Sequence, residues 1–367
     1  MAITKLNLQP ITTESDYSKI TIGDSKFTDD IWDLSPFITN KTTKDSHKKI
    51  KFHYIKNEDM KLTVKHYAYY RLGKVKPQTA FHDINSKLPI FIEYCDLNNI
   101  NSFNEVTKEV FLNYSLWIKE EKGISSGYAK CKTVEEIIKI GQIKGWDVPK
   151  SNIFIGFTSS DLWDSEKSLK ENKTKPIPED IFDKILQCAL KEKNILTKAG
   201  IIIQSQTGLR INEVLSIRQG CVHTTNDGYD YMEVTLGKTE KGEPIIHKVF
   251  INELVKNVVS ELEEYTKELR EKSGLKELFL IKDLKFNNKI DVSKKEMWNR
   301  KLNSFTQKWD IRDSKGNLYP LKSHQFRATF VRDLIKQKVP IAHIMKQFAH
   351  VSIEMTSHYL TLQEEEV

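Results

Sequence analysis

Four short stretches between Thr207 and Tyr359 contain side chains that could act on a phosphate diester. The first, TGLRINE, places Arg210 two residues after Gly208, in the predicted first turn of a helix. Free N–H groups and the helix dipole attract anions to a helix N-terminus, so a cation there needs a reason, such as a bound phosphate. Glu213, one turn later, could orient the guanidinium. Taken alone, the pattern is also typical of a surface arginine paired with this glutamate.

The second stretch, SHQFRATF, places His324 and Arg327 three residues apart on one face of a predicted helix, with Ser323 as the expected N-cap. An arginine offers a planar two-donor fork to a phosphate, and a histidine can transfer a proton at neutral pH. The pair therefore suits a phosphodiester, although a solvated helix face would show the same pattern.

The third stretch, LGKTEKGEP, puts Lys238 and Lys241 at the tip of a predicted hairpin, where a lysine could protonate a leaving oxygen or simply be solvated. The fourth, HVSIEMTSHY, holds His350 and Tyr359 nine residues apart. A tyrosine oxygen can be a nucleophile, but a capping histidine and a buried tyrosine are also common in a terminal helix.

The order and spacing of these residues resemble the tyrosine recombinase (phage integrase) family. The resemblance covers residues 176–367 through TGLR, the hairpin lysine, HQFR and the final His and Tyr; over 59–148 it is architectural only. Carried over residue by residue, it implies a catalytic set, with Lys241 as the alternative hairpin lysine: Arg210, Lys238, His324, Arg327, His350 and Tyr359.

The resemblance also implies a mechanism. The two arginines would clamp the non-bridging oxygens, and together with His324 they would help deprotonate Tyr359 or stabilise its anion. Tyr359 would then attack phosphorus to give a 3′-phosphotyrosyl link. Lys238 would protonate the departing 5′-oxygen, and His350 would hydrogen-bond a phosphate oxygen. Strand exchange through a Holliday junction would follow. The family implies no metal and no nucleotide cofactor; its partners would be double-stranded DNA at specific sites, a tetramer of the chain on paired sites, and accessory recombination proteins.

Two features depart from the family pattern. Ala349 stands where the family usually has glycine, and only the acidic LTLQEEEV follows Tyr359, which puts the usual tail contact between protomers in doubt. Two other functions stay open: DNA relaxation of the type IB topoisomerase kind, and DNA binding without cleavage. Among recombinases, the sequence favours a mobile-element integrase or transposase.

The elements that must position these residues are mainly helical. Helical spacing predicts helices within 57–72, 76–99, 104–123, 125–146, 179–191, 198–222 and 323–350, a strand within 47–56, and a hairpin within 229–251. We therefore expect a mainly α fold with a small β-sheet in the catalytic domain. The predicted organisation is an N-terminal region of unclear role (1–58), a helical core-binding domain (59–158), a polar linker (159–178) and a catalytic domain (179–367). The family implies that the two domains form a C-shaped clamp on DNA.

Composition supports an anionic partner without specifying one. The 367 residues carry 57 Lys and Arg against 50 Asp and Glu, a net charge of +7. The four cysteines form no Cys-x-x-Cys pair, and neither a signal peptide nor an 18-residue apolar run is present. The last two features predict a cytoplasmic protein. The lysine-rich composition favours a bacterial host, and the family resemblance implies association with DNA.

Overall fold

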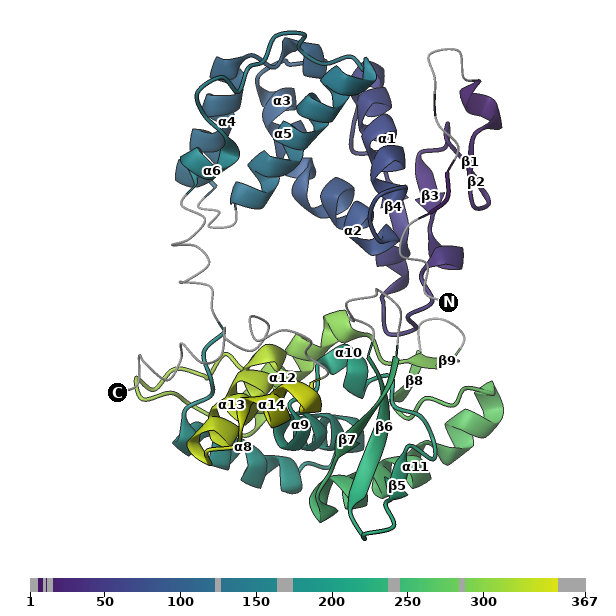
Figure 1. The fold of residues 1–367 in the computed structure, drawn as a ribbon, viewed down its shortest axis with the longest axis vertical. Helices are drawn as coiled ribbons and strands as arrows, with labels where there is room; N and C mark the ends of the chain where they lie inside the picture. Colours follow the sequence, from purple (N-terminus) through teal and green to yellow (C-terminus); the bar gives the residue numbers. More distant parts are fainter. Residues whose placement is uncertain are drawn as a thin grey trace. The chain divides into compact units, whose positions relative to one another are not determined.

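The computed structural model describes residues 6–8, 11, 16–122, 127–163, 174–236, 245–283 and 288–348. Contacts divide the chain into two compact units: Ala2–Thr39 with Asp45–Lys173, and Asn40–Lys44 with Thr174–Val367. Both units are mainly helical with small sheets (Figure 1), which confirms the predicted fold class. None of the helices within the described ranges is both long and apolar enough to span a membrane.

Over the residues that the structure describes, the first unit contains six α-helices and two small hairpins. Its helices are α1 (Glu58–Leu72), α2 (Pro77–His82), α3 (Pro89–Leu97), α4 (Lys108–Glu120), α5 (Gly127–Lys144) and α6 (Ser159–Leu162). Asn57 caps α1, because its side chain accepts the N–H groups of Asp59 and Met60 at 2.9 and 3.1 Å. The hairpins pair β1 (Thr21–Ile22) with β2 (Ser25–Lys26), and β3 (Ile31–Asp33) with β4 (Lys49–Lys51).

The N-terminal residues of this unit share the core of its helices. The strand predicted within 47–56 is β4, whose Ile50 lies opposite Trp32 of β3. Both side chains are fully buried, and so is Phe52, whose ring meets the Trp32 ring edge-on. These aromatic residues belong to the same hydrophobic cluster as α1 to α5, so the hairpins stabilise the helical unit.

The helix predicted within 76–99 is interrupted. Between α2 and α3 the chain forms a π-helical turn, Asp83–Lys87, in which the N–H of Leu88 reaches the carbonyl of Asp83 at 3.1 Å. Pro89 has no N–H to continue the first helix. The Asp83 carboxylate is buried and held by Arg71 Nε at 2.8 Å and Lys87 Nζ at 2.7 Å. Buried ion pairs thus fix a turn that apolar spacing did not predict.

The first residues of the linker predicted over 159–178 pack on the helical unit. Ser159 is buried in α6, and its N–H and hydroxyl donate to Glu135 of α5 at 3.1 and 2.6 Å. The Trp163 indole N–H donates to the Ser115 hydroxyl at 3.0 Å. These hydrogen bonds tie a polar stretch to a folded core.

In the second unit, helices surround α9 (Ile195–Thr207). The others are α8 (Glu179–Leu190), α10 (Ile211–Val214), α11 (Glu253–Ser273), α12 (Trp298–Lys308), α13 (Ser323–Lys336) and α14 (Ile341–Gln347). Helix α9 packs against α8, α11, α12 and α13 (Figure 1). Its run of apolar residues, AGIII, gives it apolar side chains on every side, as a helix surrounded by others requires.

The predicted hairpin is confirmed as β6 (Asp230–Leu236) and β7 (Ile245–Phe250), paired antiparallel from Tyr231↔Phe250 to Leu236↔Ile245. A third strand, β5 (Val222–Thr224), pairs with β6 to give the order β5-β6-β7. A second hairpin that the sequence analysis did not anticipate joins β8 (Leu280–Asp283) to β9 (Lys289–Val292).

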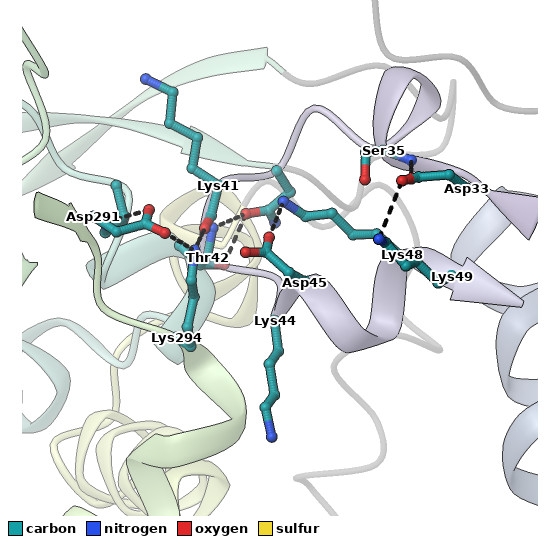
Figure 2. Close-up of polar contacts among 12 residues, drawn as sticks. Asp33, Ser35, Lys41, Thr42, Lys44, Asp45, Lys48, Lys49, Asp291 and Lys294 are labelled. Atoms are coloured by element: carbon teal, nitrogen blue, oxygen red, sulfur yellow. Dashed lines mark hydrogen bonds and ion pairs between the residues drawn. The ribbon is translucent and has the colours of Figure 1, made fainter. Parts of the chain in front are cut away.

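The short segment Asn40–Lys44 packs on this second unit through polar contacts, which we call the clasp (Figure 2). The Lys294 ammonium donates to the carbonyl of Lys41 at 2.8 Å, and the Lys41 ammonium pairs with the buried Glu277 at 3.0 Å. Two backbone N–H bonds add to the clasp, Lys295 to the Thr42 carbonyl and Lys44 to Glu296. Residues 40–44 therefore belong to the second unit, although their partners lie more than 230 residues further along the chain.

Candidate active site

Arg210 lies on a loop shaped by the end of α9. Gly208 ends that helix in the left-handed conformation, with φ of +64°, and Arg210 is then the N-cap of the four-residue helix α10 rather than a residue of its first turn. The Glu213 carboxylate accepts both the Arg210 N–H at 2.8 Å and Nη1 at 3.1 Å. Because Glu213 is 1% exposed and Arg210 is 22% exposed, the pair is anchored inside while the guanidinium still reaches solvent.

His324 and Arg327 lie near the start of α13 but differ in exposure. The helix begins one residue earlier than predicted: Lys322 is the N-cap, its N–H held by Gln325 at 2.8 Å, and Ser323 is the first helical residue. His324 is exposed, whereas Arg327 is only 2% exposed. The two side chains therefore cannot act as one solvated helix face.

Arg327 is joined to the loop that carries Arg210. Its Nη1 donates to the carbonyl of Gly208 at 3.3 Å, across 119 residues of sequence. Its guanidinium also stacks on the Phe348 ring, 3.8 Å from the ring centre. The structure thus brings together two of the predicted arginine motifs.

Gly208 allows this close approach. A Cβ atom on it would lie 2.8 Å from Phe330 of α13 and 2.9 Å from Phe348, which follows α14. Any larger residue would push these rings away and would also strain the positive φ. The glycine therefore serves both the turn and the packing behind the arginines.

The end of α14 is fastened to the hairpin. His247 Nε2 on β7 donates to the carbonyl of Gln347 at 3.0 Å. Four predicted site residues lie outside the described residues: Lys238, Lys241, His350 and Tyr359. Among the described residues, no cluster of three or more His, Cys, Asp or Glu side chains could hold a metal ion.

Two buried side chains behind the arginines were missed from the sequence. The Gln204 amide of α9 contacts Trp298 of α12 and the start of α13, and Phe348 covers Arg327. A signal existed for the first: a glutamine directly after GIII interrupts an apolar run, and a buried amide requires specific partners. Nothing comparable marked the phenylalanine.

Comparison with known proteins supports the family assignment. Residues 175–366, more than half of the chain, match the phage integrase family. The chain belongs to this family. The assignment made from the TGLR, HQFR and His-to-Tyr motifs is therefore confirmed.

Relatives of the chain include transposases. It is 24% identical over 359 residues to transposase B from transposon Tn554 of Staphylococcus aureus, and 23% identical over 344 residues to transposase B from transposon PsiTn554 of the same species. These matches cover 95% and 92% of this chain but only 53% and 51% of the relatives. The chain thus spans about half the length of these curated relatives.

Solved structures share the fold of this family member. An integrase of transposon Tn1549, solved with circular intermediate DNA, aligns with a TM-score of 0.56 at 18% identity, over 81% of this chain and 93% of that one. The recombinase XerH, bound to its difH substrate, aligns with a TM-score of 0.56 at 15% identity, over 90% of each chain. At these identities the likeness establishes the fold alone.

Proposed function

We propose that this chain is a site-specific DNA recombinase, an integrase or transposase of a mobile element, that cleaves and rejoins DNA through a 3′-phosphotyrosyl intermediate on Tyr359. Family membership and the transposase relatives support the reaction class. The observation that carries the proposal is the Arg327 bond to the Gly208 carbonyl, because it joins the second arginine motif to the loop of the first. Two guanidiniums in one site suit a phosphodiester.

In the proposed reaction, the Tyr359 hydroxyl gives its proton to His324, and its oxygen forms a bond to phosphorus while the bond from phosphorus to the 5′-oxygen breaks. Arg210 and Arg327 stabilise the charge on the non-bridging oxygens, with His324 beside them. Lys238 gives its proton to the departing 5′-oxygen, and His350 donates to a phosphate oxygen. A 5′-hydroxyl from the partner strand then gives its proton to Lys238 and attacks the phosphotyrosine. The bond from phosphorus to Tyr359 breaks, Tyr359 recovers its proton from His324, and the DNA is resealed.

The same proposal assigns roles to the two units. The helical unit would contact duplex DNA on one side and the catalytic unit on the other, as a clamp, in the bacterial cytoplasm. Four protomers would act on two paired sites, with accessory proteins setting direction. Residues 1–58 would support the helical unit, since Trp32, Ile50 and Phe52 lie in its core.

Covalent trapping tests the proposal. Nicked duplexes made from DNA flanking the gene are mixed with wild type, Tyr359→Phe and the control Tyr265→Phe, which alters an exposed tyrosine of α11. We expect a protein–DNA adduct on a denaturing gel for wild type and the control, and none for Tyr359→Phe. An adduct retained by Tyr359→Phe would refute the assigned nucleophile.

Two further outcomes distinguish the alternatives. Tight binding without any adduct would favour a DNA-binding protein that does not cleave. Relaxation of supercoiled DNA of any sequence, without joining of two sites, would favour the topoisomerase function.

A further inference from the structure

The Gln204 side chain is a fully buried amide whose nitrogen and oxygen are both hydrogen-bonded, to two distant helices and to the loop that follows α9. Its Nε2 donates to the Ser323 hydroxyl at 2.9 Å and to the Leu209 carbonyl at 3.3 Å. Its Oε1 accepts the Trp298 indole N–H at 2.9 Å. A buried amide is costly without partners, so this arrangement fixes the side chain in one orientation.

These bonds end beside the candidate catalytic residues. Leu209 immediately precedes Arg210, and Ser323 immediately precedes His324 and lies about one turn before Arg327. Gln204 therefore contacts both arginine-bearing segments, which are more than 110 residues apart in sequence.

Helix α12 completes the arrangement. Trp298 is its first residue and is 1% exposed, and the next residue, Asn299, accepts the N–H of Ser323 at 3.1 Å. Gly200 on α9 makes room for the indole, because a Cβ there would lie 2.1 Å from the Trp298 ring. Three helices thus meet at a single amide.

We propose that Gln204 is a positioning residue for the reaction, one that sets the distance between Arg210 and the His324–Arg327 turn. The inference rests on the proposed function for its catalytic consequence. Two guanidiniums that clamp one phosphate must be held to within a fraction of an ångström, and a displacement of about 1 Å can lower a rate by roughly 10²-fold. Gln204 touches no substrate and acts through the segments it joins.

The test compares Gln204→Met with Gln206→Met. Methionine keeps the length and approximate volume of glutamine but removes its amide. Gln206 lies two residues further along α9, and its amide accepts from Asn252 at 2.8 Å, outside this network. We expect Gln204→Met to form the tyrosyl–DNA adduct roughly 10- to 100-fold more slowly at saturating protein, with DNA affinity within about threefold of wild type. The control should match wild type in both.

Amide hydrogen exchange provides a readout that does not require cleavage. In Gln204→Met, exchange should become faster at both 208–210 and 323–327, and in Gln206→Met at neither. An adduct rate within about twofold of wild type, or unchanged exchange at both segments, would overturn the inference. If wild type forms no adduct at all, the proposed function fails, and exchange alone decides whether Gln204 joins the two segments.

A second variant, Trp298→Phe, tests the inference in case Gln204→Met does not fold. Trp298→Phe removes the indole N–H that Oε1 accepts and keeps an aromatic ring in place. We expect the same pattern with a smaller loss of rate. A Trp298→Phe protein that cleaves and exchanges like wild type, alongside an unfolded Gln204→Met, would mean that the amide serves stability alone.

Discussion

At the residue scale, Gly208 combines three demands in one position. It ends α9 with a positive φ, its carbonyl accepts from Arg327, and it lies against the rings of Phe330 and Phe348. Gly220 provides a natural comparison, since its φ is +72° but nothing lies within 4 Å of the Cβ position. A side chain at Gly220 would therefore add backbone strain alone, whereas one at Gly208 would add both backbone strain and steric contact.

Gly208→Ala should therefore cost more than Gly220→Ala. Strain alone costs about 1 kcal/mol in each, and displacement of the two rings should raise the loss at Gly208 to about 2–4 kcal/mol. Urea denaturation of both variants measures the difference. Equal losses would show that the phenylalanine rings move aside without cost.

At the element scale, the contact between α5 and α6 depends on a buried carboxylate. Burial by itself would raise the pKa of Glu135, but hydrogen bonds from Lys139, Ser159 and Lys132 outweigh burial and lower the pKa to about 2. Because the folded pKa lies below the unfolded value, the carboxylate stabilises the fold above about pH 4.5, and this stabilisation is lost as the pH falls toward 2.

Glu135→Gln should lower the free energy of unfolding at pH 7 by about 1–3 kcal/mol, at the lower end because both lysines are partly exposed. The difference in free energy of unfolding between wild type and Glu135→Gln should become smaller as the pH falls from 4.5 toward 2. Denaturation at a series of pH values measures it, with the exposed Glu120 of α4, changed to Gln, as the control. A gap that is constant with pH would contradict the assigned ion pairs.

At the scale of the whole molecule, the net charge of +7 should strengthen the binding of DNA, whose phosphates are negatively charged. If the two units together neutralise about six phosphates, DNA affinity should fall by about 10³-fold between roughly 50 and 200 mM salt. Fluorescence anisotropy with Tyr359→Phe would measure binding without cleavage. Affinity that stays flat over this range would rule out the clamp.

Much of the fold and part of the site follow from local sequence. The Asn57 cap, the turn at Gly208, the β6–β7 hairpin and the HQFR helix were predictable, because capping, left-handed glycine and alternation act over a few residues. The pairing of Arg210 with Glu213 was predictable for the same reason. The order of the motifs was enough to indicate the family.

Only the tertiary structure decided the contacts between distant segments. The π-helical turn at Asp83 depends on an ion pair with Arg71, and the clasp of Asn40–Lys44 depends on residues more than 230 positions away. The burial of Arg327 and its bond to Gly208 likewise required α9 and α13 to pack together. Apolar periodicity predicts which face of a helix is buried, but not the partner that a buried polar group meets there.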